Sequence, residues 1–173
     1  MPLIYECRNL PECAAEEIEK TFVVNTYEAI ASHFNSTRYK PWPKVSEFVA
    51  AATQNPGRVL VDVGFGNGKY VPSAQRSVLY LGFELANAMI AEAQRNLCHK
   101  TLLAFSSGCR AQPDFARAAV PALPLRACSA DALVCIAVLH HLASRERRIL
   151  ALRELLRVLK VGGAALVYVW PEI

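Results

Sequence analysis

Residues 58–68 read Arg-Val-Leu-Val-Asp-Val-Gly-Phe-Gly-Asn-Gly, and this stretch decides the fold. A short apolar, β-branched run leads into a turn with glycines at alternate positions (Gly64, Gly66, Gly68). Such glycines let the backbone take left-handed conformations and approach a ligand closely. The spacing differs from the dinucleotide fingerprint, whose third glycine would fall at Lys69, and from the phosphate-binding P-loop. The stretch therefore predicts a strand that ends in a ligand-binding turn of another kind.

Two acidic residues accompany this turn. Asp62 stands just before the first glycine, and Glu84 ends the next apolar run, 77–84. An acid at the end of the second strand is suited to accept ribose hydroxyl groups, and Asp62 could orient the loop or hold an ammonium group. The pattern is typical of an S-adenosylmethionine site. The alternatives are a glycine turn that only packs a helix on a sheet and a solvated surface acid at Glu84.

The rest of the chain alternates between helical and extended patterns. Helices are expected over 14–34, 44–53, 85–97 and 144–160, with Ser144 as the N-cap and Gly162-Gly163 as the end of the last helix. Strands are expected over 58–63, 77–84, 100–105, 131–142 and 164–170, with a loop and a helical turn around 113–118. This alternation predicts an α/β fold with a doubly wound, mostly parallel sheet. We divide the chain into an N-terminal helical extension, 1–57, and a sheet domain, 58–173.

Composition excludes several classes of protein. The chain has 173 residues, of which 53% are hydrophobic and 20% charged, which fits one folded domain and excludes disorder. We expect no membrane span and no secretory signal, and a net charge of +4 is too small to indicate nucleic-acid binding by itself. The six cysteines form no Cys-x-x-Cys pair, so we expect no metal site and no disulfide framework. Reduced thiols favour the cytoplasm as the location, with the nucleus as a second compartment.

Longer stretches resemble a known family. Residues 24–34 and 36–43, the latter reading Ser-Thr-Arg-Tyr-Lys-Pro-Trp-Pro, resemble the opening of the eukaryotic tRNA wobble-uridine carboxymethyl methyltransferases. They are also similar to the methyltransferase half of the AlkB-like tRNA modification enzyme. The likeness continues through 66–70, 136–142, 145–148 and 165–170, and covers nearly the whole chain from about residue 17.

The resemblance implies a Rossmann-like, class I methyltransferase fold with strand order 3-2-1-4-5. It implies S-adenosylmethionine as the cofactor and tRNA as the substrate, with methylation of the carboxylate of 5-carboxymethyluridine at position 34. It also implies a small zinc-binding activator protein as a partner. Family members continue beyond the fifth strand with two more strands, so we expect this chain to be short at its C-terminus.

The chain departs from the family pattern at three places. Phe65 stands where a cysteine is usual, and Glu84 replaces an aspartate. Ala118 and Ala119 fall where a Gly-Asp pair normally reaches the adenine amino group. Two alternatives therefore stay open: a non-catalytic protein with an impaired cofactor site, and a methyltransferase that acts on another substrate.

The implied reaction defines what the substrate site needs. A uridine-linked carboxylate has a pKa of roughly 4 and is already anionic at neutral pH, so methyl transfer requires no general base. The site must instead hold the carboxylate in line with the methyl group. We expect Arg38 to grip it, because a guanidinium binds a carboxylate bidentately. His140 and His141 lie at the end of the expected fourth strand, where such sheets open; His140 is the candidate contact, and a packing role for these histidines is the alternative.

The segment after Arg38 is the candidate surface for RNA. Tyr39 and Trp42 could stack a flipped base while Lys40 holds a phosphate; the alternative is that Trp42 anchors the start of a helix in the core. His141 is a further candidate for substrate contact. The helix over 144–160 carries a basic face that could bind RNA or simply be solvated, with Glu146 and Glu154 pairing within it (Arg145, Arg147, Arg148, Arg153, Arg157, Lys160).

Overall fold

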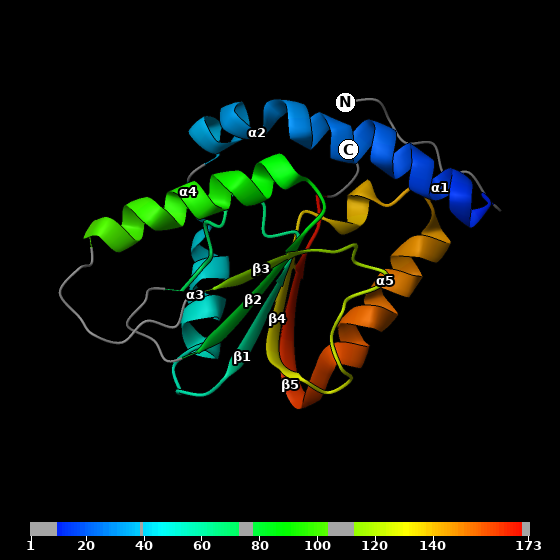
Figure 1. Ribbon diagram of the computed structural model, residues 1–173. Helices are drawn as coiled ribbons and strands as arrows, with labels where there is room; N and C mark the ends of the chain where they lie inside the picture. Colours follow the sequence, from blue (N-terminus) through cyan, green and yellow to red (C-terminus); the bar gives the residue numbers. More distant parts are fainter. Residues whose placement is uncertain (1–9, 39, 73–77, 104–112, 171–173) are drawn as a thin grey trace.

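A five-stranded parallel sheet organises the chain, in the order β3-β2-β1-β4-β5 (Figure 1). The computed structural model describes residues 10–38, 40–72, 78–103 and 113–170. The strands are β1 (Val59–Val63), β2 (Leu79–Glu84), β3 (Asp114–Arg117), β4 (Ala130–Ile136) and β5 (Leu159–Tyr168). The helices are α1 (Glu12–Glu19), α2 (Asn25–Thr37), α3 (Pro43–Ala52), α4 (Asn87–Leu103) and α5 (Arg145–Val158). The predicted fold class and strand order are confirmed.

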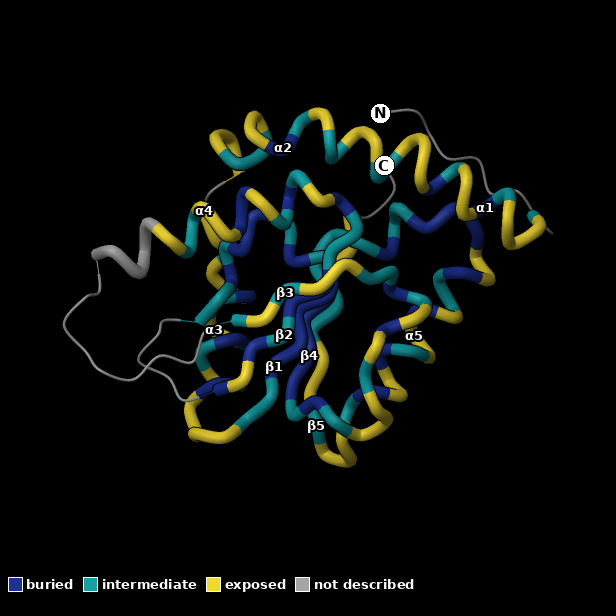
Figure 2. The backbone as a smooth tube through the Cα atoms, viewed as in Figure 1, coloured by how far each residue is buried: buried dark blue, intermediate teal, exposed yellow. Residues whose placement is uncertain are grey.

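The two central strands, β1 and β4, are buried on both faces (Figure 2). Their side chains alternate between the faces, so each strand contributes to two layers of core. One layer joins Val61, Val63, Leu133 and Cys135 to Ala151, Leu155 and Val158 of α5. The other joins Leu60, Ala132 and Val134 to Val45 and Val49 of α3.

A long N-terminal helix crosses the end of the sheet where the strands finish (Figure 1). It consists of α1, a π-helical segment over Lys20–Val24, and α2, with helical backbone throughout. α2 lies beside α4, and Tyr27, Ala31 and Phe34 of α2 pack with Ala86 and Met89. Among the described helices, none is both long and apolar enough to cross a membrane.

The structure corrects three predicted elements. The third strand is Asp114–Arg117, paired with β2, so the helical turn expected around 113–118 is wrong. The strand expected over 100–105 is wrong as well for 100–103, which belong to α4, while 104–105 lie outside the described residues; a short apolar run fits a helix as well as a strand. The fourth strand ends at Ile136 because Ala137 adopts a left-handed φ of 59°, and the expected strand end becomes a 3-10 turn over Leu139–His141.

The last helix ends at Val158 rather than at the glycines, which lie inside β5. Leu159 already has extended angles, φ −70° and ψ 137°, so the chain enters the strand directly. The predicted N-cap is confirmed, since the Ser144 hydroxyl accepts a hydrogen bond from the Arg147 amide.

Candidate functional site

The glycine turn follows β1 at the carboxyl end of the sheet, as predicted. Gly64, Gly66 and Gly68 all have positive φ, of 71°, 57° and 71°. A Cβ atom on Gly64 would lie 2.2 Å from Cγ2 of Val138, and one on Gly68 would lie 3.0 Å from Cβ of Ala93. Gly64 therefore lets the end of β4 approach the turn, and Gly68 lets α4 do so.

Glu84 lies against this turn. Its Oε2 accepts a hydrogen bond of 3.2 Å from the Gly66 amide, and its Oε1 accepts bonds of 2.7 and 3.1 Å from the amides of Leu85 and Ala86. Burial raises the pKa of this carboxyl group. A carboxylate has about four acceptor positions, so the three amides leave one on Oε2. That position fits a ribose hydroxyl group.

Asp62 is buried in the layer between the sheet and α3. The Tyr80 hydroxyl donates to its Oδ2 over 2.7 Å, and burial raises the pKa of the carboxyl group to about 7. The contact ties β1 to β2 directly beneath the turn. Both roles considered for Asp62, orienting the loop and holding an ammonium group, stay predictions.

α2 covers the turn from outside the sheet. A Cβ atom on Gly66 would lie 3.5 Å from Cε of Met89 and 4.0 Å from Cε1 of Phe34. The Glu28 carboxylate accepts bonds of 2.6 and 2.9 Å from the amides of Asn87 and Ala88, and so caps the start of α4. A ligand on the glycine turn would be enclosed between the sheet, α2 and α4.

A network of amide side chains joins α2, α4 and the turn. Asn35 donates from Nδ2 to Glu92 over 3.1 Å and to Asn96 over 3.2 Å, and its Oδ1 accepts from Asn67 over 3.0 Å. Oδ1 of Asn67 is buried without a partner in the described part of the chain. A buried, unpaired acceptor in the ligand-binding turn fits a donor group on a ligand.

Tyr27 and His141 form a second contact between α2 and the sheet. The Tyr27 hydroxyl lies 3.1 Å from Nε2 of His141. Burial raises the pKa of Tyr27 and lowers that of His141 to about 4, with a further lowering from His140. The phenol and a neutral imidazole therefore share one hydrogen bond at physiological pH. His141 is occupied by this bond, whereas Nδ1 of His140 is buried with no partner among the described residues.

The candidate substrate residues fall into different surroundings. Arg38 is exposed at the end of α2, with its guanidinium carbon 5.3 Å from the centre of the Phe34 ring. Lys40 is exposed as well, and Tyr39 lies outside the described residues. The Trp42 ring contacts Tyr168 and Trp170, at centroid distances of 4.9 and 5.4 Å. This placement gives Trp42 a packing role at the start of α3, the alternative left open by the sequence.

The predicted basic face of α5 is interrupted by a buried arginine. Arg147 is only 4% exposed and binds Glu19 of α1 through two hydrogen bonds of 2.7 and 2.8 Å. It also pairs with Glu12 and Glu16. Arg147 thus cannot take part in an RNA-binding face. Glu154 pairs with Arg157 within the helix, as expected.

The departures from the family pattern have clear positions. The Ala118 amide donates to the Glu84 carbonyl over 3.2 Å, which places Ala118, with no carboxylate of its own, beside Glu84; Asp114 lies at the far end of β3. Phe65 is buried and stacks on Phe115, with centroids 4.4 Å apart. A Cβ atom on Gly82 would lie 2.7 Å from Phe65, so glycine makes room for this pair.

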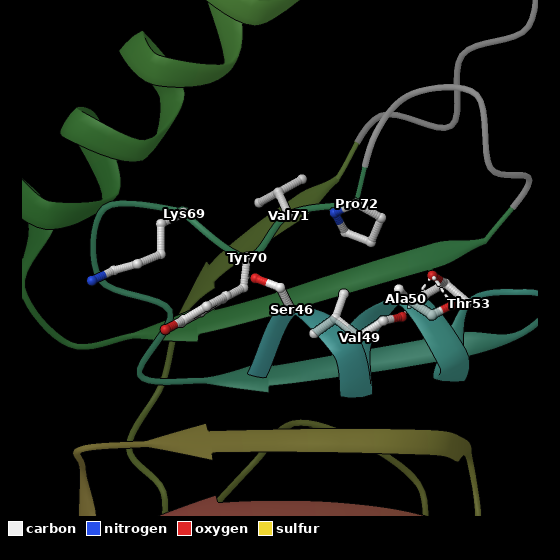
Figure 3. A pocket seen from close by; sticks show the side chains of 8 residues that line it. All are labelled: Ser46, Val49, Ala50, Thr53, Lys69, Tyr70, Val71 and Pro72. Atoms are coloured by element: carbon white, nitrogen blue, oxygen red, sulfur yellow. Dashed lines mark hydrogen bonds between the residues drawn. The ribbon is translucent and has the colours of Figure 1, made fainter. Parts of the chain in front are cut away.

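A separate pocket of about 190 Å³ lies between α3 and the segment after the glycine turn (Figure 3). It is lined by Ser46, Val49, Ala50, Thr53, Lys69, Tyr70, Val71 and Pro72. The ammonium group of Lys69 lies at the end near the Tyr70 hydroxyl and away from Thr53 (Figure 3).

Several contacts at the site were not predicted. Tyr27, Glu28 and Phe34 reach the site because α2 crosses the end of the sheet. The helical periodicity of the sequence does not predict that crossing. Their position in the family-like stretch 24–34 was the available signal. Asn67 was visible inside the glycine motif, but its partner Asn35 was not.

Comparison with curated proteins identifies similar sequences. The chain is 39% identical over 160 residues to a tRNA (carboxymethyluridine(34)-5-O)-methyltransferase of Xenopus tropicalis, covering 92% of this chain and 22% of that protein. It is 39% identical over 154 residues to the enzyme of that name from Arabidopsis thaliana, with 89% of this chain and 34% of the relative covered. For the Saccharomyces cerevisiae enzyme the identity is 35%, over 90% of this chain and 50% of the relative. The chain thus spans between about a fifth and a half of the length of these relatives.

Solved structures share the fold at lower identity. The magnesium protoporphyrin IX methyltransferase of Synechocystis, solved with bound S-adenosylmethionine, superposes with a TM-score of 0.62 at 19% identity, over 88% of this chain and 74% of that one. A Haloferax volcanii protein solved in complex with the Trm112 methyltransferase activator gives a TM-score of 0.58 at 16% identity, over 84% of this chain and 59% of that one. Residues 61–167, from the middle of β1 to near the end of β5, match the family model described as a methyltransferase domain. The chain, with its glycine turn and Glu84 on this sheet, therefore belongs to the methyltransferase-domain family.

Proposed function

We propose that this chain transfers a methyl group from S-adenosylmethionine to the carboxylate of 5-carboxymethyluridine at position 34 of tRNA. The observation that carries the proposal is the contact of Glu84 with the glycine turn beneath α2, with Arg38 at the end of that helix. The relatives at 35–39% identity that bear this activity in their names support the choice of substrate.

The described residues fit the cofactor. Glu84 has one acceptor position free for a ribose hydroxyl group, and the positive-φ glycines allow the backbone to approach. Bound S-adenosylmethionine would supply an electrophilic methyl group. The protein needs to orient the substrate carboxylate toward it, at about 3–3.5 Å, and to exclude water.

Arg38 is the group we assign to the substrate carboxylate. It is exposed and forms no ion pair with any residue that the structure describes, so its donors are available. His141 is bound to Tyr27, and this contact joins α2 to the turn after β4. A substrate carboxylate that is already ionised needs no general base.

We further propose that the chain works with tRNA and a small zinc-binding activator protein in the cytoplasm, with the nucleus as a second compartment. The Haloferax volcanii methyltransferase solved with its activator has the same fold, which makes such an arrangement compatible with this sheet.

The direct test compares three tRNAs as methyl acceptors, with the activator present and absent. One carries 5-carboxymethyluridine at position 34, one carries unmodified uridine there, and one carries 5-carboxymethyluridine in a different loop. We expect transfer to the first only, and the product ester should be cleaved by mild alkali. Arg38→Met should keep the affinity for S-adenosylmethionine within a few-fold and lower the methylation rate strongly. Equal loss of both would assign Arg38 to the cofactor.

One observation favours a second candidate, a non-catalytic member of the family. The adenine end of the site offers Ala118 and Ala119 in place of a carboxylate, and backbone amides occupy most of the Glu84 carboxylate. Isothermal titration with S-adenosylmethionine separates the two functions. Micromolar binding that Gly66→Val abolishes supports the enzyme, and no binding supports the non-catalytic protein.

A further inference from the structure

Two cationic side chains approach one aromatic ring above the glycine turn. The guanidinium carbon of Arg38 lies 5.3 Å from the centre of the Phe34 ring, and Nζ of Lys69 lies 5.8 Å from the same centre. Phe34 itself lies next to Gly66. Both cations are therefore at the carboxyl end of β1, where ligands bind in sheets of this kind.

Neither cation is neutralised. Within the described residues, Arg38 and Lys69 form no ion pair; the nearby Asp62 carboxylate is buried and accepts the Tyr80 hydroxyl. Burial and the charge of Arg38 lower the pKa of Lys69. Two like charges held around one ring repel each other, and an anion that lies near both offsets this repulsion.

We propose that Lys69 and Arg38 together bind an anionic oxygen of the substrate, with Phe34 as the apolar surface between them. The identity of that substrate rests on the proposed function. Lys69 is a new assignment for substrate binding, since the sequence analysis assigns Arg38 to the substrate carboxylate and Lys40 to a phosphate. The same chemistry could come from the carboxylate of the modified uridine or from a phosphate beside it.

The position of the Lys69 side chain allows its ammonium group to contact such an anion. Its stem lines the pocket between α3 and the turn, and its ammonium group lies at the end of the pocket beside the Tyr70 hydroxyl (Figure 3). It also lies 5.8 Å from the centre of the Tyr70 ring. The two aromatic rings limit the positions of the amine, which reduces the entropy lost when an anion binds.

The test measures binding of two tRNAs, identical except for 5-carboxymethyluridine or uridine at position 34, to wild type, Lys69→Met and Lys69→Arg. Arg126→Met is the matched control, because Arg126 precedes β4 and so lies at the opposite end of the sheet. We expect Lys69→Met to lose about tenfold or more in affinity, as for a hydrogen bond to a charged group. Lys69→Arg should retain most of the affinity, and Arg126→Met should bind like the wild type.

The two tRNAs separate the sources of the anion. If the anion is a phosphate, Lys69→Met weakens the binding of both tRNAs equally. The salt dependence of the binding constant then falls by the equivalent of about one phosphate contact. If the anion is the carboxylate, Lys69→Met weakens only the binding of the modified tRNA. Unchanged binding of both tRNAs, or an equal loss in the Arg126→Met control, overturns the proposal. So does a tenfold loss of S-adenosylmethionine affinity, which would assign Lys69 to the cofactor.

The ionisation of Lys69 can also be measured directly, without an activity assay. The pKa of the Lys69 amine, followed by NMR, should rise when tRNA binds, because a neighbouring anion favours the charged amine. An unchanged pKa in a tRNA-bound protein would count against the proposal. If the wild type binds tRNA through Lys69 but does not methylate it, the proposed function fails while the anion site stands.

Discussion

Gly64 is the residue at which the backbone of the turn is most restricted. Its φ of 71° disfavours any side chain, and Val138 would lie 2.2 Å from an added Cβ. We expect Gly64→Ala to lower the free energy of unfolding by about 2–4 kcal/mol, from left-handed strain and overpacking together. Gly162→Ala is the matched control, because Gly162 has a φ of 78° and no atom within 4 Å of its Cβ position. Urea unfolding of both variants should separate the clash with Val138 from the backbone strain of a positive φ. Equal losses of stability in the two variants would show that Val138 moves aside.

Asp62 gives the fold a measurable dependence on pH. Its pKa rises from an ordinary value of 3.8 to about 7 in the folded protein, chiefly through burial. The folded state therefore binds this proton more tightly than the unfolded state, so the free energy of unfolding should fall as the pH rises from about 4 to about 7. Above that range the contribution of Asp62 should be constant.

Asp62→Asn isolates this effect. His141, whose pKa is lowered to about 4, acts in the opposite direction over part of the range, so the wild type alone is not informative. We expect the stability of the wild type relative to Asp62→Asn to decrease between pH 4 and pH 7 in urea unfolding. A difference that is the same at both pH values would mean that Asp62 is ionised throughout.

At the scale of elements, the pair Glu19–Arg147 fastens α1 to α5. Both side chains are less than 10% exposed, and Oε1 of Glu19 also accepts the amide of Ala143. Removing one partner leaves the other charge buried without compensation, which typically costs about 3–5 kcal/mol. We expect Arg147→Met to lose that much stability and to expose α1 to proteolysis.

Lys20→Met is the control for this prediction. Lys20 pairs with Glu17 on the helix surface, where both side chains are more than 60% exposed. An exposed pair contributes at most about 1 kcal/mol, so this variant should unfold like the wild type. Comparable losses in the two variants would show that the contact between α1 and α5 is weaker than its geometry indicates.

Local signals explain which elements the sequence could predict. Adjacent residues encode β1, β2 and the glycine turn. The position of Glu84 near that turn can be predicted from its distance to the glycines in the sequence. β3 is only four residues long and is defined by its pairing with Leu81–Glu84, a contact that no local pattern reveals. The contacts of Glu28 and Lys69 depend likewise on how α2 lies over the sheet, which is a property of tertiary packing.

At the scale of the whole molecule, β5 is an exposed edge of the sheet (Figure 2). Among the described strands it pairs only with β4, and Val161 in it is 99% exposed. An apolar edge with free amide and carbonyl groups favours pairing with a second chain. We expect the purified chain to self-associate, and Val161→Lys to reduce that association in sedimentation velocity without lowering the free energy of unfolding.

Leu156→Lys provides the comparison for the edge. Leu156 is 69% exposed on α5, away from the hydrogen-bonding groups of the strand. If this variant relieves self-association and Val161→Lys does not, the association runs through the helix rather than through the sheet edge.

The π-helical segment over Lys20–Val24 has a consequence for insertions and deletions in this protein. A π-helical turn accommodates an extra residue in an otherwise α-helical chain. Removing one residue between Glu19 and Asn25 would therefore restore regular α-helix with α1 and α2 in nearly the same rotational register. Keeping every residue but forming regular α-helix there would instead rotate α1 by about 100° relative to α2. Glu19 would then point away from Arg147 while Tyr27 and Phe34 kept their places. The π-helical conformation of this segment, more than the identity of its side chains, keeps both ends of the long helix facing their partners.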